Sequence, residues 1–287
     1  MTGIDYTNDI DVLRTWVGRT RSTTDTVSAT ACRRLADTIG HTGSLSNGDR
    51  LPPLWHFITH LESVPLDQLG PDGHPTRGGF LPPVLLPRRM WAGGRLTFTG
   101  DILVGDEVVK TSTVDSVEMK TGRSGELCFV AVSHELSVDG EVRIREEQDL
   151  VYKDDPAPGA VSPEPKRAPE SFDFERSIEP TETMLFRYSA LTFNAHRIHY
   201  DLNYAQTVEE YPGLVFHGPL TATLLADLAV AETGQQLASF AFRGQAPLFA
   251  SAPFRIAGTR EGDEVSLWAT TPSGGVAMSA TATLRTR

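Results

Sequence analysis

The amino-acid sequence predicts an α+β protein built from two similar halves, each with helices packed against antiparallel strands. Three observations lead to this prediction. A proline-rich segment divides the chain into nearly equal parts, short sequence matches recur in the same order on both sides of it, and many strand-like runs alternate apolar and polar residues. Such alternation is typical of half-buried antiparallel strands, and the recurrence indicates duplication followed by divergence.

The dividing segment, over 154–171, reads DDPAPGAVSPEPKRAPES and is rich in proline. Proline fixes φ and lacks a backbone N–H, so this stretch favours extended, solvated backbone and cannot form a helix or a central strand. We therefore predict an N-terminal domain over 1–153, a linker over 154–171 and a C-terminal domain over 172–287.

The two predicted domains echo each other. The run Gly105-Asp106-Glu107-Val108 recurs as Gly262-Asp263-Glu264-Val265, and each copy lies between two strand-like runs. Upstream, TVSATACRRLADTIG resembles SIEPTETMLFRYSALTFN in frame, and LPPLWHFITHL occupies a place comparable to that of YPGLVFHGPLTATLLADL. Each match is short, and their common order is what indicates an internal repeat.

Each half is expected to open with a short helix, over 30–39 and over 181–191. Thr181 is an acceptable N-cap for the second of these helices. A longer helix is predicted over 219–233, because leucines recur there at helical spacing and Gly234 provides a C-terminal stop.

Strands are expected after the helices in both halves, and Asp139-Gly140 gives a strong hairpin-turn signal between two of them. One long helix wrapped by an antiparallel sheet is the hotdog arrangement. The predicted architecture is therefore a double hotdog, in which two sheets each wrap a long helix and pack as a pseudo-dimer. The predicted strands span 95–99, 107–117, 127–138, 142–152, 241–244, 249–257, 264–270 and 275–285.

Composition excludes several classes of function. The formal net charge of −11 repels nucleic acid and anionic lipid. No run approaches the roughly 18 apolar residues of a membrane span, and the N-terminus lacks a signal-peptide pattern. We therefore expect a cytoplasmic protein without a nucleic-acid or membrane partner. Cys32 and Cys128 are expected to be buried thiols. No glycine-rich nucleotide loop is present, so no cofactor is expected.

The most informative stretch, over 186–220, reads FRYSALTFNAHRIHYDLNYAQTVEEYPGLVFHGPL. It gathers several polar residues between apolar ones and ends in a Gly-Pro helix start. A histidine can take up and release a proton near neutral pH, and backbone N–H groups at a helix start can stabilise a developing oxyanion. The polar residues in question are Asn194, His196, His199, Asp201 and His217.

Within this stretch, LTFNAHRIHYD resembles the hydratase motif S-G-D-x-N-P-L-H of MaoC-like (R)-specific enoyl-CoA hydratases. The motif histidine falls on His199, and Asn194 stands where the family has its catalytic aspartate. LVFHGPL resembles V-H-G-M-L, which places Gly218 on the glycine whose N–H faces the thioester oxygen. Where the sequence differs from these motifs, as at Asn194, it resembles a narrower subgroup of the family, and so does LPRRMWAGG upstream. This subgroup contains the type 2 hydroxyacyl-thioester dehydratases and the 3-methylfumaryl-CoA (mesaconyl-CoA) or itaconyl-CoA hydratases.

The resemblance implies a hydro-lyase that adds water reversibly to an α,β-unsaturated acyl-CoA, most simply a branched dicarboxylic one that yields citramalyl-CoA. His199 would transfer the proton, Asn194 would orient the water because an amide is no base, and Gly218 would hold the thioester oxygen. The first half lacks this pair and is expected to be non-catalytic. The residues expected to contact substrate are His196, Arg197, His217, Arg88 and Arg89.

Several alternatives stay open. Within the same chemistry, the chain could be a 3-hydroxyacyl-thioester dehydratase of fatty-acid or polyketide metabolism. Other classes are an acyl-CoA thioesterase, which would release free CoA, and a non-catalytic acyl-CoA-binding protein. His199, Asp201 and His217 could imitate a two-histidine, one-carboxylate iron site, although the expectation is that no metal is bound. Self-association into a homo-oligomer is left open.

Overall fold

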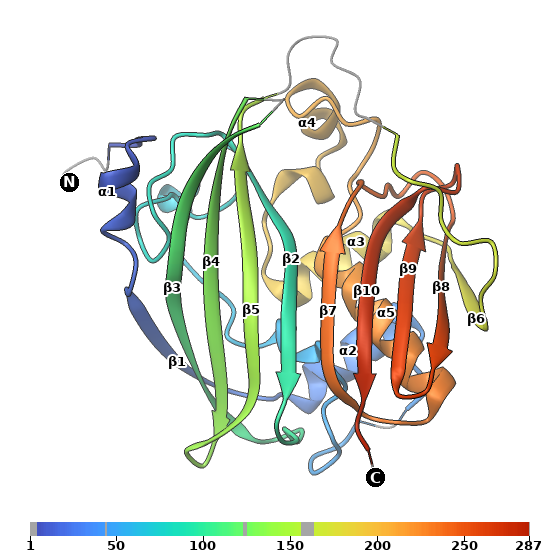
Figure 1. Cartoon of the computed structure of the whole chain (residues 1–287). Coiled ribbons are helices and arrows are strands. Elements are labelled where there is room, and N and C mark those ends of the chain that lie inside the picture. Colours follow the sequence, from blue (N-terminus) through green and yellow to red (C-terminus); the bar gives the residue numbers. More distant parts are fainter. Residues whose placement is uncertain (1–4, 44, 123–124, 156–163, 287) are drawn as a thin grey trace.

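All ten strands lie in one continuous sheet that crosses both halves of the chain (Figure 1). The structure is a computed structural model and describes residues 5–43, 45–122, 125–155 and 164–286. The strand order is β1-β3-β4-β5-β2-β7-β10-β9-β8-β6, and neighbouring strands are antiparallel. The strands are β1 (Thr20–Thr26), β2 (Arg88–Phe98), β3 (Glu107–Gly122), β4 (Gly125–Val138), β5 (Glu141–Lys153), β6 (Phe174–Ile178), β7 (Leu237–Gly244), β8 (Phe254–Glu261), β9 (Glu264–Thr270) and β10 (Val276–Leu284).

Each half contributes five strands, and counted from its own outer edge each half has the same strand order: β1-β3-β4-β5-β2 in the first half and β6-β8-β9-β10-β7 in the second. The halves meet at β2 and β7, which pair antiparallel from Gly93 opposite Arg243 to Thr97 opposite Ser239. The α+β class is confirmed, but the expectation of two separate sheets is wrong. An unpaired strand edge exposes backbone N–H and C=O groups, and pairing β2 with β7 satisfies both inner edges at once.

The helices expected from sequence are present. They are α2 (Ala29–Ile39), α3 (Glu182–Thr192) and α5 (Gly218–Thr233). Thr181 caps α3 by accepting a hydrogen bond from the N–H of Met184, and Gly234 ends α5 in the left-handed conformation. Short helices lie at α1 (Ile10–Arg14) and α4 (Leu202–Thr207). No helix in the described part of the chain is long and apolar enough to cross a membrane.

Among the residues that the structure describes, the first half has no counterpart of the long helix α5, so the prediction that each sheet wraps a long helix is wrong. Where that helix was expected, the described residues form the single 3-10 turn η1 (Trp55–Ile58). Prolines precede this turn, and Leu54 and His60 adopt left-handed backbone on either side of it. The turn nevertheless fills the core, because Trp55 is fully buried and His56 bonds to the buried Glu146 at 3.1 Å.

The repeated Gly-Asp-Glu-Val run does not mark equivalent positions. Its first copy leads into β3 and its second into β9. By the order of strands from the two edges, the counterpart of β3 is β8. Gly105 and Gly262 both have positive φ, at 99° and 62°. The shared letters therefore reflect two turns of similar chemistry, whereas the strand order itself carries the repeat.

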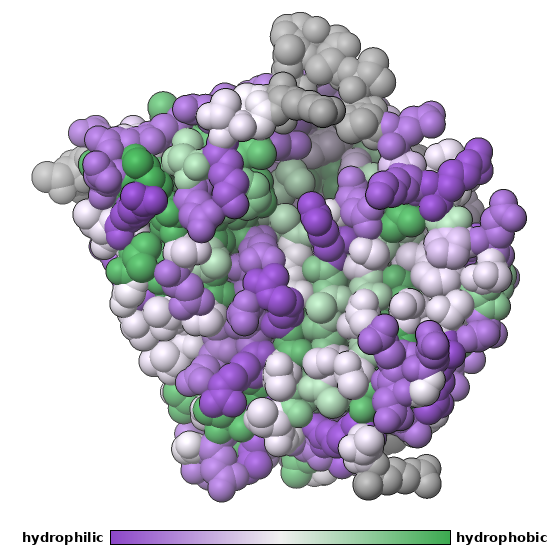
Figure 2. Space-filling view, viewed as in Figure 1, coloured by the Kyte–Doolittle hydropathy of each residue, from purple (hydrophilic) through white to green (hydrophobic). Residues whose placement is uncertain are grey.

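The sheet has one face covered by helices and one outer face. In Figure 1 the helices α2, α3 and α5 lie behind the sheet, and Figure 2 shows the outer face as a mixture of hydrophilic and weakly apolar surface. The described end of the predicted linker crosses the second half's outer face, where its Ala168 and the following Phe172 pack near Trp268. Residues 156–163 of that linker lie outside the described residues.

Candidate active site

The polar residues singled out from sequence lie between the end of α3 and the start of α5. Phe193 ends α3 with a φ of 49°, and the side-chain oxygen of Asn194 then accepts a hydrogen bond from the N–H of His196 at 3.0 Å. The 3-10 turn η3 (Arg197–His199) follows. This turn presents His199 toward the start of α5, because Val215 donates its N–H to the carbonyl of Ile198.

His199 is held in one tautomer. Its Nδ1 donates to the carbonyl oxygen of Val215 at 2.7 Å, which leaves Nε2 as a proton acceptor. The side chain is buried, with 8% of the residue surface exposed. Burial lowers the pKa of His199 to about 4, although the hydrogen bond to Val215 opposes this shift. At neutral pH the ring is therefore an uncharged base.

His217 lies flat against His199. The ring centroids are 3.7 Å apart and the planes differ by 18°. His217 Nε2 is 2.9 Å from the hydroxyl of Ser189 on α3, and the ring is almost fully buried. Burial and then the charge of His199 lower the pKa of His217 well below its usual value. Its position makes His217 a support for the ring of His199 rather than a group at the surface.

Gly218 is the first residue of α5, directly after His217. The first N–H groups of a helix have no acceptor within the helix, and Pro219 has no N–H to offer. A Cβ built on Gly218 would meet no atom within 4 Å. Gly218 therefore places an N–H without a helical acceptor directly after the stacked His217, and no side chain outside its immediate neighbours crowds its Cα.

The site also contains two residues that sequence reasoning missed, Asp72 and His74, which come from the first half. Asp72 Oδ2 lies 3.1 Å from His74 Nδ1, and the His74 ring lies 4.1 Å from the His196 ring. The His196 ring in turn lies 5.5 Å from that of His199. Four imidazoles thus follow one another, and we call His74, His196, His199 and His217 the histidine row.

A signal for this loop was present in the sequence. Asp72-Gly73-His74 places a glycine between two titratable residues in a long segment rich in proline and glycine, and functional residues concentrate on such loops. Gly73 has a φ of 88°, and a Cβ there would lie 1.9 Å from the carbonyl oxygen of Ala195. The glycine is therefore required for the two halves to approach each other at the site.

Arg197 is engaged in packing the site. Its guanidinium pairs with Asp201 at 2.7 Å, lies 4.1 Å from the ring centre of Tyr204 and donates to the carbonyl of Pro71 at 3.0 Å. Asp201 caps α4 by accepting from the N–H of Tyr204. Both carboxylate oxygens of Asp201 thus already accept hydrogen bonds, from Arg197 and from the N–H of Tyr204. Among the described residues, the group with metal-ligand spacing is instead Asp72, His74 and His196.

The two predicted arginines of β2 differ in their surroundings. Arg88 pairs with Asp155 at 2.7 Å and lies 3.6 Å from a carboxylate oxygen of Glu209. Arg89 is opposite Tyr152 of β5, and after burial its charge is the next cause that lowers the pKa of His74. Burial, His74 and His199 lower the pKa of His196, and Arg89 adds to them. Within the described ranges no carboxylate lies within ion-pair distance of Arg89. Arg89 is therefore one of two described cations beside the histidine row without a carboxylate partner; the other, Arg77, is bonded to the backbone carbonyls of Val84, Leu86 and Pro87.

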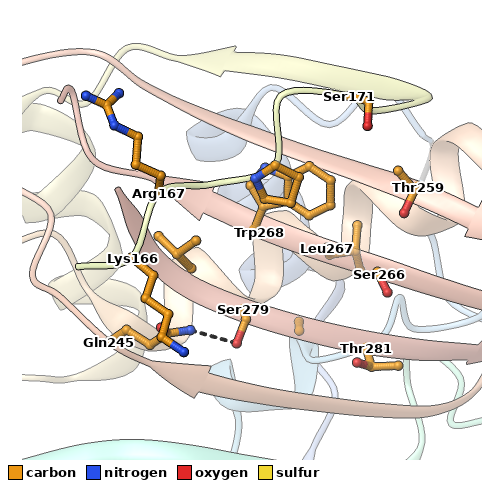
Figure 3. Close-up of a pocket in the computed structure, with 13 residues that line it drawn as sticks. Lys166, Arg167, Ser171, Gln245, Thr259, Ser266, Leu267, Trp268, Ser279 and Thr281 are labelled. Atoms are coloured by element: carbon orange, nitrogen blue, oxygen red, sulfur yellow. Dashed lines mark hydrogen bonds between the residues drawn. The ribbon is translucent and has the colours of Figure 1, made fainter. Parts of the chain in front are cut away.

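A hollow of about 680 Å³ lies elsewhere, on the outer face of the second half's strands (Figure 3). Lys166 and Arg167 of the linker border it, and Trp268 lies at its centre. None of its lining residues belongs to the histidine row. It is thus separate from the candidate active site.

Comparison with known proteins decides the family. Residues 54–250 match the family model described as hydroxyacyl-thioester dehydratase type 2. The chain belongs to this family. It is therefore a hydro-lyase, and the resemblance found from sequence is confirmed. A mesaconyl-C(4)-CoA hydratase of Chloroflexus aurantiacus is 44% identical over 94% of this dehydratase-family chain and 96% of its own length. A mitochondrial hydroxyacyl-thioester dehydratase type 2 of Schizosaccharomyces pombe is 28% identical over 76% and 80%.

Solved structures agree on the fold. A MaoC-like dehydratase from Phytophthora capsici superposes with a TM-score of 0.73, covering 96% of this chain and 98% of its own, at 12% identity. HtdX from Mycobacterium tuberculosis superposes with a TM-score of 0.66 over 91% and 98%, at 17% identity. The hotdog-like fold of MaoC dehydratases is therefore confirmed for this family member.

Proposed function

We propose that this chain adds water reversibly to the carbon–carbon double bond of an α,β-unsaturated acyl-CoA. The observation that carries the proposal is His199, a neutral imidazole whose Nδ1 donates to Val215, whose Nε2 is free to accept a proton, and whose ring stacks on His217, the residue directly before Gly218. The same relationship suits both directions of the reaction, because one imidazole can take a proton and return it.

The proposed step divides three tasks among neighbouring residues. His199 Nε2 takes a proton from water as the water oxygen bonds to the β-carbon, and the resulting imidazolium delivers a proton to the α-carbon. The N–H of Gly218 holds the enolate-like oxygen between these events. Asn194 uses its side-chain oxygen on His196, so its NH2 group is the part that can donate to the water.

The proposed substrate is a branched dicarboxylic acyl-CoA of the 3-methylfumaryl or itaconyl type. The 44% identity to a mesaconyl-C(4)-CoA hydratase supports this class, and so does the uncompensated charge of Arg89 near the histidine row. A free carboxylate on the substrate needs such a cation in a partly buried site. Arg88 is less suited, because Asp155 and Glu209 already compensate its charge.

The domain division stays part of the proposal. Residues 1–153 and 172–287 would each form one half of the sheet, and the second half would carry His199 and Gly218. In the first half, Gly40 ends α2 and the nearby Leu45 is buried in the core, which supports the absence of a second His199 there.

The test is a spectroscopic assay of the enoyl-thioester band with purified protein and a panel of CoA esters, with and without a second carboxylate. Loss of the band, with formation of the hydroxyacyl-CoA and no free thiol, is expected. Release of free CoA would indicate a thioesterase instead. Preference for 3-hydroxyacyl thioesters without a second carboxylate would favour the dehydratase alternative that the Schizosaccharomyces pombe relative suggests.

A further inference from the structure

The hydratase motif requires a carboxylate where this chain has Asn194, yet the structure brings a carboxylate to the histidine row from the other half. We propose that Asp72 and His74 are positioning residues of the active site, which stabilise through His196 the imidazolium that forms on His199. This inference rests on the proposed function. Both halves of the chain then contribute residues to one active site, although the first half has no counterpart of His199.

The loop that carries Asp72 is fixed against the second half by backbone contacts. The carbonyl of Asp72 accepts the N–H of Arg197 at 2.9 Å, and the carbonyl of Pro71 accepts from the Arg197 guanidinium at 3.0 Å. Between them, Gly73 lies so close to the carbonyl of Ala195 that a Cβ would not fit. A loop held this way keeps its side chains at a defined distance from the row.

Asp72 sets the tautomer of His74. One carboxylate oxygen lies 3.1 Å from Nδ1 of His74 and the other accepts the backbone N–H of His74 at 3.0 Å. Burial alone would raise the pKa of Asp72, but the hydrogen bonds from His74 and its charge outweigh it, so the pKa of Asp72 is lowered. Asp72 is therefore ionised, His74 carries its proton on Nδ1, and the pair resembles the carboxylate–imidazole half of a catalytic triad.

The charges around His74 come from both halves. Arg77 on the same segment and Arg89 on β2 disfavour a protonated His74, whereas Asp72 favours it. His196 is disfavoured as a cation by burial, by His74, by His199 and by Arg89, and Asp72 opposes these effects. The negative charge of Asp72 thus lowers the free energy of a transient positive charge on the histidine row.

The chemistry is balanced without any further reactant. Water loses one proton to an imidazole and bonds to the β-carbon through oxygen, and the α-carbon gains one proton from that imidazole. A positive charge exists on His199 between these two transfers. Asp72 acts on this charge through the ring contacts of 4.1 Å and 5.5 Å that link His74, His196 and His199.

A metal ion is the competing explanation for the same residues, because Asp72, His74 and His196 have ligand atoms within 4.8 Å of one another. The described contacts favour hydrogen bonding, since Nδ1 of His74 faces Asp72 and both carboxylate oxygens already accept from His74. The nearby Arg89 also opposes a second cation. Metal analysis of the purified full-length protein decides this, and a stoichiometric metal that Asp72→Asn removes would overturn the proposal.

The main test compares Asp72→Asn with Asp227→Asn in the full chain. Asp227 is a control, because it too accepts from Nδ1 of a histidine, that of His41 at 2.8 Å, and lies outside the row. Asp72→Asn is expected to lower kcat by roughly 10- to 100-fold, the effect of one hydrogen bond to a charged group, with little change in KM. Asp227→Asn is expected to leave kcat near that of the unmodified protein.

The pH profile separates a positioning role from a structural one. Asp72 favours protonated imidazoles, so its removal lowers their pKa, and the acidic limb where activity is lost should move to lower pH. Damage to the fold would reduce the rate without moving this limb. If Asp72→Asn does not fold, His74→Asn provides the same comparison of kcat. Folded variants with unchanged kcat and an unmoved limb contradict this inference, whereas an inactive unmodified protein contradicts the proposed function.

Discussion

His199 and His217 stack face to face at 3.7 Å while each is bonded to a different element, His199 to the carbonyl of Val215 and His217 to Ser189 on α3. Two imidazolium rings at that distance would repel each other, and burial already lowers the pKa of both. One proton is thus the most that this pair takes up during a turnover. The uncharged His217 ring packs against the His199 ring, whose orientation is also fixed by the hydrogen bond to Val215.

The first prediction separates the two residues of the hydratase motif. His199→Ala should abolish turnover, because it removes the proposed proton-transfer group, whereas Asn194→Ala should leave a measurable rate, because Asn194 only orients water. Loss of the amide is expected to cost roughly 10- to 100-fold in kcat. Steady-state kinetics on an enoyl-CoA substrate provide the measurement. Near-normal activity in His199→Ala would remove the mechanism altogether.

The second prediction uses two glycines that differ in their surroundings. Gly218→Ala should fold normally, since its Cβ would meet no atom within 4 Å apart from its chain neighbours and its own helix backbone, but the added methyl group should obstruct the thioester oxygen and lower kcat/KM. Gly73→Ala should instead lower the unfolding midpoint, because the new Cβ would collide with the backbone of Ala195 and the φ of 88° disfavours alanine. Thermal unfolding and kinetics of both variants distinguish the two effects. A destabilised Gly218→Ala protein would contradict the first assignment.

Local signals predicted much of the fold. The cap at Thr181, the stop at Gly234 and the hairpin at Asp139-Gly140 were predicted from residue chemistry, and Asp139 and Gly140 indeed have positive φ between β4 and β5. The edge strands β1 and β6 were missed. β1 is exposed along its whole length and reads TRSTTDT, so it has none of the apolar alternation that marks a half-buried strand.

The site was predictable where its residues are close in sequence. His199, His217 and Gly218 are close because the segment between α3 and α5, which contains η3 and α4, folds back so that Ile198 bonds to Val215. Asp72 and His74 were not predictable in the same way, since a contact between two halves depends on how the whole sheet is assembled. The absence of the long helix in the first half has a similar origin, because prolines and left-handed residues around η1 override the apolar pattern that suggested a helix.

The third prediction concerns stability at low pH. Burial lowers the pKa values of His60, His134 and His199 to about 4, whereas the unfolded chain titrates near the ordinary value of 6.5. The unfolded state therefore binds protons first as the pH falls, and stability present above pH 6.5 is lost toward pH 4. For His134 alone this amounts to about 3 kcal/mol. Urea unfolding at pH 7.5 and pH 5 should show a lower midpoint at pH 5, and an unchanged midpoint would contradict it.

The last prediction assigns substrate selectivity to Arg89 by comparison with its neighbour. Arg89 has no ion-pair partner among the described residues, so Arg89→Gln should raise KM for a dicarboxylic enoyl-CoA by roughly 10- to 100-fold, the value of one charge-assisted hydrogen bond. An enoyl-CoA without the second carboxylate should be affected far less. Arg88→Gln breaks the pairs with Asp155 and Glu209 and should act equally on both substrates. If Arg88→Gln alone discriminates between the two substrates, the carboxylate is bound by Arg88 and the role given to Arg89 is wrong.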